Sequence, residues 1–496
     1  MQQIDLARLD EADRVIQGIA TGFGLDFMPQ EFDLVPAQKM LEIMAYRLPV
    51  NFSHWSFGRD YEIERTRHEH GYAVPYEVVF NSDPCRAYLM ETNPFPIQVM
   101  VMAHVYAHND FMKNSRHFQL TRRDMISSAS EAAGRLRRYE EDYGLEAVEK
   151  LIDAGMAIQW NIDPGEPIHN ETEEHTRERL YGWGKLLPAQ GTFDDLLPAK
   201  EKPSPEEKVK LRKKSPPEPT IDLLGYITEH SPRSLQEWEK DVLAIIRNQA
   251  QYFMPYRRTK IMNEGWATYW HEKIMQRLFT DRFLTAEEHG YYNLYNARVK
   301  AHHRRMVNPY LLGCALFGSI ESRWNKGRFG QEYEECTDAQ DKKHWDSAVM
   351  KGRAKIFEVR RTHMDWFFVD EFLNKEVVDD LDLYTYQEKD HYTHYESVVD
   401  ETDWTKVKKT LVQSLMNWGI PRILVTDGNY QGSLQLYLKH AFEGLVLDDE
   451  YCRKTLEYLY YLWDRPVFLE TGEPRKYRVR RKIYEINERG IRVRSD

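Results

Sequence analysis

The chain has 496 residues, of which 42% are hydrophobic and 13% aromatic, enough apolar side chain for a folded protein of about two or three domains. Its formal net charge of −11 at pH 7 excludes a global basic field that would recruit nucleic acid or an anionic membrane. The longest strongly apolar run, residues 97–107, is too short to span a bilayer, and the first 23 residues lack the pattern of a secretory signal. We therefore expect a cytoplasmic protein with no nucleic-acid partner and no membrane span.

Cysteine usage agrees with that expectation. Cys85, Cys314, Cys336 and Cys452 are far apart and form no Cys-x-x-Cys pair. The sequence thus predicts neither a thiolate zinc cluster nor a disulfide framework, and it fits a reducing compartment.

Most of the chain before residue 396 has helical periodicity. The predicted helical ranges are 1–47, 121–160, 171–186, 233–254, 259–279 and 285–376. A short β-hairpin is expected from the β-prone stretches 76–80 and 86–91, which flank the turn signal "NSDP". The Lys-, Glu- and Pro-rich segment 199–219 is predicted to be exposed; a solvated linker is favoured there over a phosphate- or nucleic-acid-binding patch. The sequence therefore predicts a mainly helical domain over 1–395.

The pattern changes after about residue 396. A helix is expected over 402–419, "RILVTD" and "LQLYLKH" are typical of strands, and "DEYCRKTLEYLYYLW" predicts another helix. "YRVRRKIYEI" and "RGIRVRSD" are typical of a closing hairpin. This order predicts a small α+β domain over 396–496.

The stretch "MAHVYAHNDF", residues 102–111, places two histidines four residues apart in an apolar run that is predicted to be helical. His104 and His108 would share one helix face, like the ligands of the zinc motif H-E-x-x-H, although Val105 stands where that motif has its Glu. With 18 histidines in 496 residues, roughly 0.65 such pairs are expected by chance, so packed core histidines remain an alternative. Burial favours a metal site. Both nitrogens of a buried imidazole need partners, and one metal ion would satisfy a nitrogen of each ring.

A second stretch, "NEGWATYWH", strengthens the metal interpretation. It resembles the N-E-G-x-A sequence around the third ligand of one branch of the Glu-ligand zinc peptidases, the gluzincins, which predicts Glu264 as a ligand. An ordinary helix start with an acid near its positive end would give the same letters. Together the two stretches predict a gluzincin-like helical site in which His104, His108 and Glu264 hold zinc, with small residues such as Gly265 letting the second helix approach the metal.

A hydrolytic zinc site also needs a base, and Val105 cannot take a proton. The candidates are Asp110, just after the histidine turn, His271, two turns beyond Glu264, and Glu91, on the predicted hairpin. His271 could instead be a fourth ligand, a group behind a ligand or a packing residue. Thr268 could orient a ligand through its hydroxyl group.

Two further features concern substrate. His54 and Arg59 in the aromatic stretch 50–62 could line a pocket, although packed or solvated roles explain them equally well. An exposed edge of the hairpin 76–91 could pair with an extended peptide.

Five stretches together resemble the stage V sporulation protein R (SpoVR) family over about the first 330 residues: "HWSFGRDYE", "SDPCRAYLMETN", "MAHVYAHNDFMKN", "MNEGWATYWH" and "NPYLLG". The resemblance implies a role in forming the spore cortex, a peptidoglycan layer, or in stress-related regulation, since members also occur in bacteria that make no spores. It also implies a serine protein kinase and a protein with a von Willebrand-like domain as partners, because related genes neighbour theirs. The resemblance implies no particular activity.

Three interpretations remain open. The first is a zinc-dependent amidase or peptidase acting on a peptide or a cell-wall precursor. The second is a non-catalytic metal-binding regulator or scaffold that acts with the kinase system. The third is a protein whose histidines are structural. The 156 positions between His108 and Glu264 exceed the usual spacing in the zinc peptidases, and a helical insertion would account for them.

Overall fold

The structure is a computed structural model of the chain. It describes residues 5–47, 52, 54–69, 77–163, 165, 173–181, 215–302, 306–391, 394–475 and 478–495. Most of the segment that was predicted to be exposed, residues 199–214, therefore lies outside the described residues. At its described end, Pro216 and Pro217 are buried while Glu218 and Pro219 are exposed; the exposure of residues 199–214 stays a prediction.

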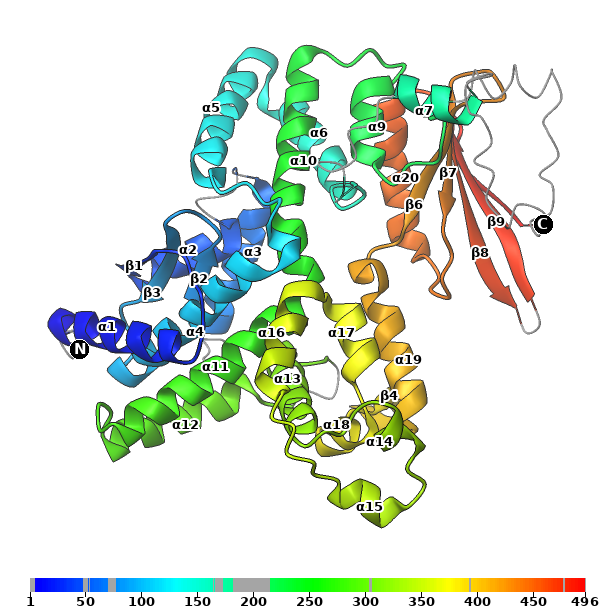
Figure 1. The fold of residues 1–496 in the computed structure, drawn as a ribbon. Helices are drawn as coiled ribbons and strands as arrows, with labels where there is room; N and C mark the ends of the chain where they lie inside the picture. The colour runs from blue at the N-terminus through cyan, green and yellow to red at the C-terminus, as the bar shows by residue number, and fades with distance from the viewer. Residues whose placement is uncertain are drawn as a thin grey trace. The chain divides into compact units, whose positions relative to one another are not determined.

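The chain divides into two compact units (Figure 1). The first comprises residues 1–134 and 252–419, and the second comprises residues 135–251 and 420–496. The domain boundary predicted between residues 395 and 396 stays a prediction.

The first unit is mainly helical, as predicted. Its helices are α1 (Leu6–Gly22), α2 (Ala37–Tyr46), α3 (Trp55–Glu69), α4 (Phe95–Asn114), α11 (Lys260–Thr280), α12 (Ala286–Val299), α13 (Pro309–Asn325), α14 (Gln331–Glu335), α15 (Ala339–His344), α16 (Gly352–Thr362), α17 (Asp365–Phe372), α18 (Lys375–Asp380) and α19 (Trp404–Leu415). Short 3₁₀ turns lie at η1 (Arg116–Phe118) and η3 (Met416–Gly419). Helices α5 (Met125–Tyr143) and α10 (Glu237–Arg258) contribute residues to both units.

A three-stranded sheet in the first unit contains the predicted hairpin. Strands β2 (Glu77–Phe80) and β3 (Cys85–Met90) pair antiparallel, and β1 (Gln30–Val35) lies parallel to the other side of β3. The helical prediction for residues 30–35 was therefore wrong. Phe32 and Leu34, two residues apart, both pack against the core, which is the alternation of a strand rather than of a helix. A separate two-stranded sheet, β4 (Thr385–His391) with β5 (His394–Glu401), was not predicted.

Helix α4 runs through the core of the first unit. Pro96 lies in its first turn, where a proline is well tolerated, and every residue from Pro96 to Met112 is buried. A helix that is apolar on nearly all sides needs neighbours on all sides, and α1, α11, α12 and the sheet provide them. The polar side chains within this run are therefore held in a protein interior.

Helix α11 is anchored at its start and packs closely along its side. The Asp365 carboxylate accepts the backbone N–H groups of Ile261 and Met262 at 2.8 and 2.9 Å, which satisfies donors that a helix start leaves open. A Cβ at Gly265 would lie 2.3 Å from the Cα of Gly313 on α13. Gly265 thus permits a close approach to α13, whereas the sequence suggested that it lets the second helix approach a metal.

The second unit holds a five-stranded α+β sheet with strand order β10-β9-β8-β7-β6. The strands are β6 (Ile423–Tyr430), β7 (Gln435–His440), β8 (Val467–Arg475), β9 (Arg478–Asn487) and β10 (Gly490–Ser495), and the helices are α6 (Leu145–Ala157), α7 (Glu173–Tyr181), α9 (Leu223–His230) and α20 (Asp449–Trp463), with most of α10. The predicted closing hairpin is present as β9 and β10. Strands β7 and β8 are parallel, so the chain needs a crossover between them, and α20 supplies it.

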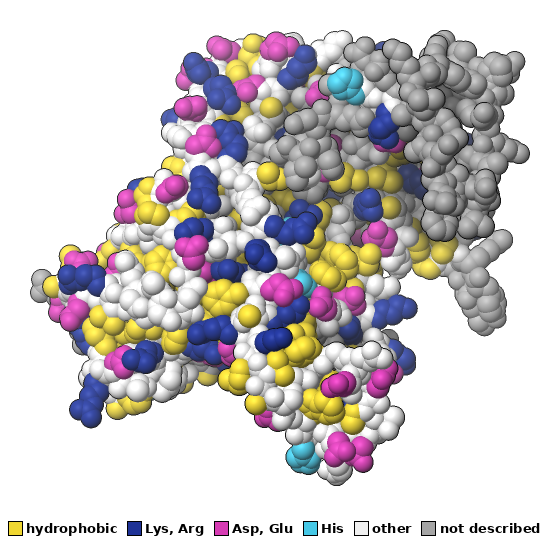
Figure 2. All heavy atoms as spheres, viewed as in Figure 1, with side chains coloured by type: hydrophobic (Ala, Val, Ile, Leu, Met, Phe, Trp, Pro, Cys, Tyr) yellow, Lys and Arg dark blue, Asp and Glu magenta, His cyan; other side chains and the backbone are white. Residues whose placement is uncertain are grey.

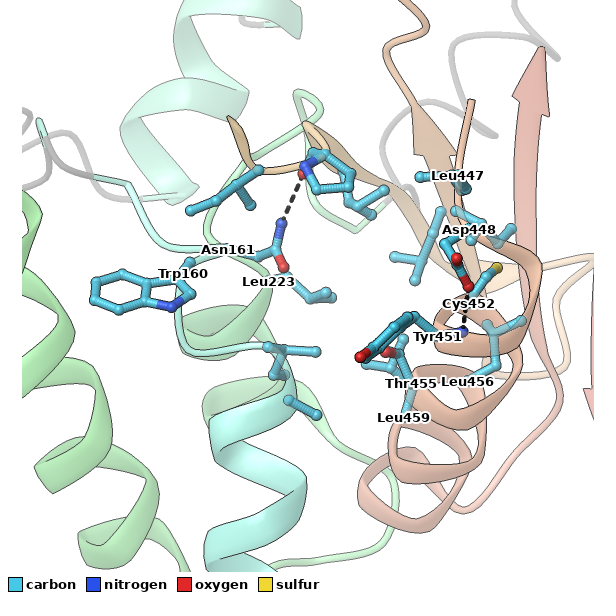
Figure 3. A pocket seen from close by; sticks show the side chains of 17 residues that line it. Trp160, Asn161, Leu223, Leu447, Asp448, Tyr451, Cys452, Thr455, Leu456 and Leu459 are labelled. Atoms are coloured by element: carbon cyan, nitrogen blue, oxygen red, sulfur yellow. Dashed lines mark hydrogen bonds between the residues drawn. The ribbon is translucent and has the colours of Figure 1, made fainter. Parts of the chain in front are cut away.

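An apolar pocket of about 240 Å³ lies within the second unit (Figure 3). Side chains of α20, including Cys452, Leu456 and Leu459, face residues from the end of α6 and from the sheet. Asn161, which lines the pocket, donates its amide N–H to the carbonyl of Pro421 at 3.1 Å. This pocket contains none of the residues predicted to bind a metal.

The surface charges, the apolarity of the helices and the state of the cysteines can also be described. On the face drawn in Figure 2, acidic and basic side chains are interspersed. None of the helices in the described parts of the chain is both long enough and apolar enough to cross a membrane. Each of the four cysteines has a free thiol, as predicted, and burial raises the pKa of Cys85 and of Cys314 to about 12.

Candidate metal centre

Two imidazoles project from one face of α4. The ring centroids of His104 and His108 are 4.6 Å apart, with their planes at 85°. Only 5% and 4% of the two side chains are exposed. The four-residue spacing in the sequence therefore produces a buried pair on one helix face.

Helix α11 packs against α4 and brings a carboxylate to the pair. Glu264 Oε2 lies 3.6 Å from His104 Nε2 and 3.4 Å from His108 Nε2. The three residues that the sequence proposed as metal ligands thus lie together, although 156 positions separate His108 from Glu264.

A fourth side chain, which sequence reasoning missed, completes the cluster. Glu77 on β2 places Oε1 3.7 Å from His104 Nε2. The ligand atoms of Glu77, His104, His108 and Glu264 all lie within 4.8 Å of one another; below we call these four residues the His/Glu cluster. An acid inside the β-prone stretch "YEVVF" was the available signal, but only the packing of the hairpin against α4 reveals where it points.

Hydrogen bonds on the far side of the His108 ring determine which nitrogen faces the cluster. His108 Nδ1 lies 2.9 Å from Asn263 Oδ1, and an amide oxygen only accepts. Nδ1 therefore carries the proton of the neutral ring, and Nε2 presents a lone pair to Glu264. His104 engages its own Nδ1 with His271 Nδ1 at 2.8 Å, so its Nε2 is also the nitrogen that faces the cluster.

The cluster lacks partners for its inward-facing atoms. His104 Nε2 and Glu264 Oε2 are buried without a hydrogen-bond partner among the described residues, a costly arrangement in a protein interior. A tetrahedral centre with ligands at 2.0–2.2 Å would separate its ligand atoms by about 3.3–3.6 Å. The observed separations of 3.4, 3.6 and 3.7 Å are close to that range. Two imidazoles and two carboxylates in this arrangement fit a divalent cation.

The two carboxylates differ in their affinity for a proton. Burial raises the pKa of Glu77, and the charge of Glu264 raises it further, while His104 opposes the rise. Burial acts in the same direction on Glu264, but the neighbouring imidazoles of His104 and His108 hold its pKa well below its usual range. Burial would lower the pKa of His108, yet Glu264 raises it above its ordinary value. Glu264 is therefore the anion of the cluster, and Glu77 is the carboxylate that takes up a proton more readily.

Asp110, proposed from the sequence as a base, lies outside this cluster. Arg360 on α16 contacts both carboxylate oxygens at 2.6 Å, Trp266 Nε1 donates at 2.8 Å, and the backbone N–H of Asp26 donates at 2.7 Å. The carboxylate is fully buried. Burial raises the pKa of Asp110, and Arg360 opposes the rise. The structure thus surrounds Asp110 with partners that hold α4, α11 and α16 together.

The other two residues proposed on α11 lie near the cluster in different ways. His271 is buried and contacts His104 on the side away from Glu264; burial lowers the pKa of His271 well below its ordinary value. Thr268 donates its hydroxyl to the backbone carbonyl of Glu264 at 2.8 Å. The Thr268 hydroxyl therefore contacts the α11 backbone, whereas the sequence suggested that it orients a ligand side chain.

The remaining candidates are not part of the cluster. Glu91 follows β3 in a turn, where its backbone N–H donates to the carbonyl of Val35 at 2.9 Å. His54 is buried beside Ser56, 2.8 Å from its hydroxyl, and Arg59 pairs with Asp60 on the surface of α3.

Comparisons with known proteins place almost the whole chain in one family. The family model described as "SpoVR like protein" matches residues 3–420, and the model described as "SpoVR-like C-terminal domain" matches residues 421–474. The chain belongs to the SpoVR family, as its sequence stretches indicated. It is 28% identical over 481 residues to a protein of Escherichia coli (strain K12) described as "Uncharacterized protein YcgB", an alignment that covers 93% of this chain and 90% of the relative. No solved structure matches the chain.

Proposed function

We propose that the chain is a metal-dependent hydrolase of amide bonds, in which His104, His108 and Glu264 hold zinc and Glu77 is the general base. The observation that carries the proposal is the convergence of four ligand atoms from α4, α11 and β2, two of which are buried without partners. Two imidazoles and one carboxylate are a common catalytic zinc set, as in the gluzincin pattern. With no matching solved structure, the gluzincin likeness rests on that ligand pattern alone.

Each residue has a defined part in this proposal. A bound zinc ion would supply a Lewis acid that polarises a substrate carbonyl and activates a water molecule. Glu77 would accept the proton of that water, because it lies beside His104 but comes from β2, whereas the three ligands come from α4 and α11. It would thereby take the role for which the sequence suggested Asp110, Glu91 or His271.

The surroundings of Glu77 favour a peptide-like substrate. Among the described residues, β2 is an edge strand, since the sheet order is β1-β3-β2. An extended peptide could pair with the open side of β2 and bring its carbonyl toward Glu77. Together with the family name, this suggests a peptide or a peptidoglycan-precursor amide as the substrate class.

The test compares wild-type protein with Glu77→Gln. Both proteins, freed of affinity histidines and loaded with zinc, are incubated with a peptide library that includes cell-wall stem peptides, and new amine termini are found by mass spectrometry. We expect cleavage by wild type only, while Glu77→Gln retains zinc. If zinc-loaded wild type shows no cleavage beyond that of Glu77→Gln, the hydrolase proposal fails. A metal-binding regulator acting with a serine kinase system then becomes the better account.

A further inference from the structure

A chain of hydrogen bonds runs from the back of His104 to the partly exposed end of α12. His104 Nδ1 lies 2.8 Å from His271 Nδ1, and His271 Nε2 lies 3.0 Å from Asn296 Oδ1. Asn296 Nδ2 donates to Glu272 Oε1 at 2.7 Å, and Lys300 Nζ lies 2.6 Å from the same oxygen. His271 and Asn296 are both buried, so the chain is shielded from water along most of its length.

The charged end of this chain fixes the direction of each bond. The Glu272 carboxylate only accepts, so it takes hydrogens from Lys300 and from the amide nitrogen of Asn296. The amide oxygen of Asn296 must then face His271. An amide oxygen also only accepts, so the proton of the His271 ring is on Nε2.

The proton on His271 Nε2 also determines the hydrogen bond to His104. A neutral imidazole has one N–H group, so His271 presents a lone pair at Nδ1, and His104 must donate from its own Nδ1. We propose that His271 is a positioning residue that fixes the tautomer of His104, so that the Nε2 lone pair faces Glu264 and Glu77. The inference rests on the proposed metal function, and it adds His271, Asn296 and Glu272 to the residues that prepare the site.

The second imidazole offers an internal comparison. His108 donates from Nδ1 to Asn263 Oδ1, so an amide does for His108 what an imidazole does for His104. The Oδ1 atom of Asn has nearly the same place along its side chain as the Nδ1 atom of His. Replacing His271 with Asn should therefore preserve the acceptor, whereas Leu would remove it. Both orienting groups are neutral, so they add no negative charge to a centre that already holds two carboxylates.

The experiment uses the full chain in four forms: wild type, His271→Leu, His271→Asn and Asn293→Ala. Asn293 lies on the same helix as Asn296, but its side chain is on the surface. Zinc affinity is measured by competition with a chelator. Ring ¹⁵N shifts of the histidines, with His104 assigned from a His104 variant, report the tautomer in metal-free protein.

We expect metal-free wild type to carry the His104 proton on Nδ1. His271→Leu should weaken zinc binding about 10- to 100-fold, the range for losing a group behind a ligand. His271→Asn should restore most of that loss, and Asn293→Ala should match wild type. Should His271→Leu fail to fold by circular dichroism, Asn296→Leu replaces it and is expected to weaken zinc binding in the same direction.

Two results would overturn the inference. One is a His104 proton on Nε2 in wild type. The other is wild-type zinc affinity in folded His271→Leu or, where that variant does not fold, in Asn296→Leu. The tautomer is measured without metal or substrate. Absent zinc binding or absent hydrolysis would therefore contradict the proposed function while leaving this result readable on its own.

Discussion

Two polar clusters are buried along α4, only two residues apart in sequence. In one, both oxygens of Asp110 accept hydrogen bonds from Arg360, and further bonds come from Trp266 and a backbone amide. In the other, His104 Nε2 and Glu264 Oε2 face each other at 3.6 Å, and neither has a hydrogen-bond partner among the described residues. Asp110 thus has all its partners within the protein, whereas the facing atoms of the His/Glu cluster have none among the described residues.

The difference separates a structural cluster from a binding one. A buried carboxylate with an Arg partner is complete within the protein and ties together the helices that supply it. A set of facing acceptors gains stability from a group that brings positive charge, such as a proton or a metal ion. Substitutions in the two clusters should therefore differ in their effects on stability and on metal binding.

The largest expected effect is on the complete cluster. Asp110→Ala would leave Arg360 buried without its partner, which typically costs about 3–5 kcal/mol of unfolding free energy. The measurement is urea unfolding of metal-free protein. Asp26→Ala is the control, because its exposed side chain forms an ion pair with partly exposed Lys113, and it should cost less than about 1 kcal/mol. A loss below about 1 kcal/mol for Asp110→Ala would remove the structural role.

The second effect belongs to the incomplete cluster. Zinc at a thousand times its dissociation constant should raise the unfolding free energy by about 4 kcal/mol, because it binds the folded chain alone. Glu264→Gln should abolish most of this gain, whereas Asp110→Asn should keep it. Thermal unfolding with and without chelator gives both answers. Equal zinc stabilisation of wild type and Glu264→Gln would show that zinc binds elsewhere.

A smaller effect is expected at the group behind His108. Asn263→Ala should weaken zinc binding about 10-fold or more, because Nδ1 of His108 loses its acceptor. Asn109→Ala is the matched control: this buried amide on α4 bonds to the backbone of Met28 and not to a ligand. The control should lose stability without losing zinc affinity. The tautomer argument for His108 fails if the two variants bind zinc equally well.

The smallest effect on the metal is expected at Val105. This side chain is fully buried in the apolar core, so Val105→Ala should leave the zinc content at the wild-type value. It should cost about 1–3 kcal/mol of stability through the lost methyl groups. Chelator competition and urea unfolding on the same sample separate the two effects, and a parallel loss of zinc would mean that Val105 shapes the site.

Local sequence patterns revealed part of the site. The four-residue interval between His104 and His108 and the stretch around Glu264 are local features, and the structure brings all three residues together. Glu77 could not be found in this way, because its position depends on how the hairpin packs against α4. The partner of Asp110 is equally remote: Arg360 lies 250 residues away, so Asp110 looked like an uncommitted acid.

Local sequence patterns likewise predicted only part of the fold. The helix predicted over residues 259–279 agrees with α11 (Lys260–Thr280) within one residue at each end. Strand β1 was read as helix, since Phe32 and Leu34 are too few to distinguish the two periods. Strand β8 was missed because Gly472 and Pro474 interrupt it near its end, and pairing with β7 and β9 holds it in the sheet.

The most direct test of the central claim is elemental analysis of the full chain, purified without affinity histidines. The account predicts close to one equivalent of zinc per chain in wild type and almost none in the double variant His104→Ala/His108→Ala. It also predicts full zinc content in His363→Ala, which removes a buried histidine that contacts Glu371 at 2.9 Å outside the cluster. Much less than one equivalent in well-folded wild type, or zinc retained by the double variant, would contradict the account.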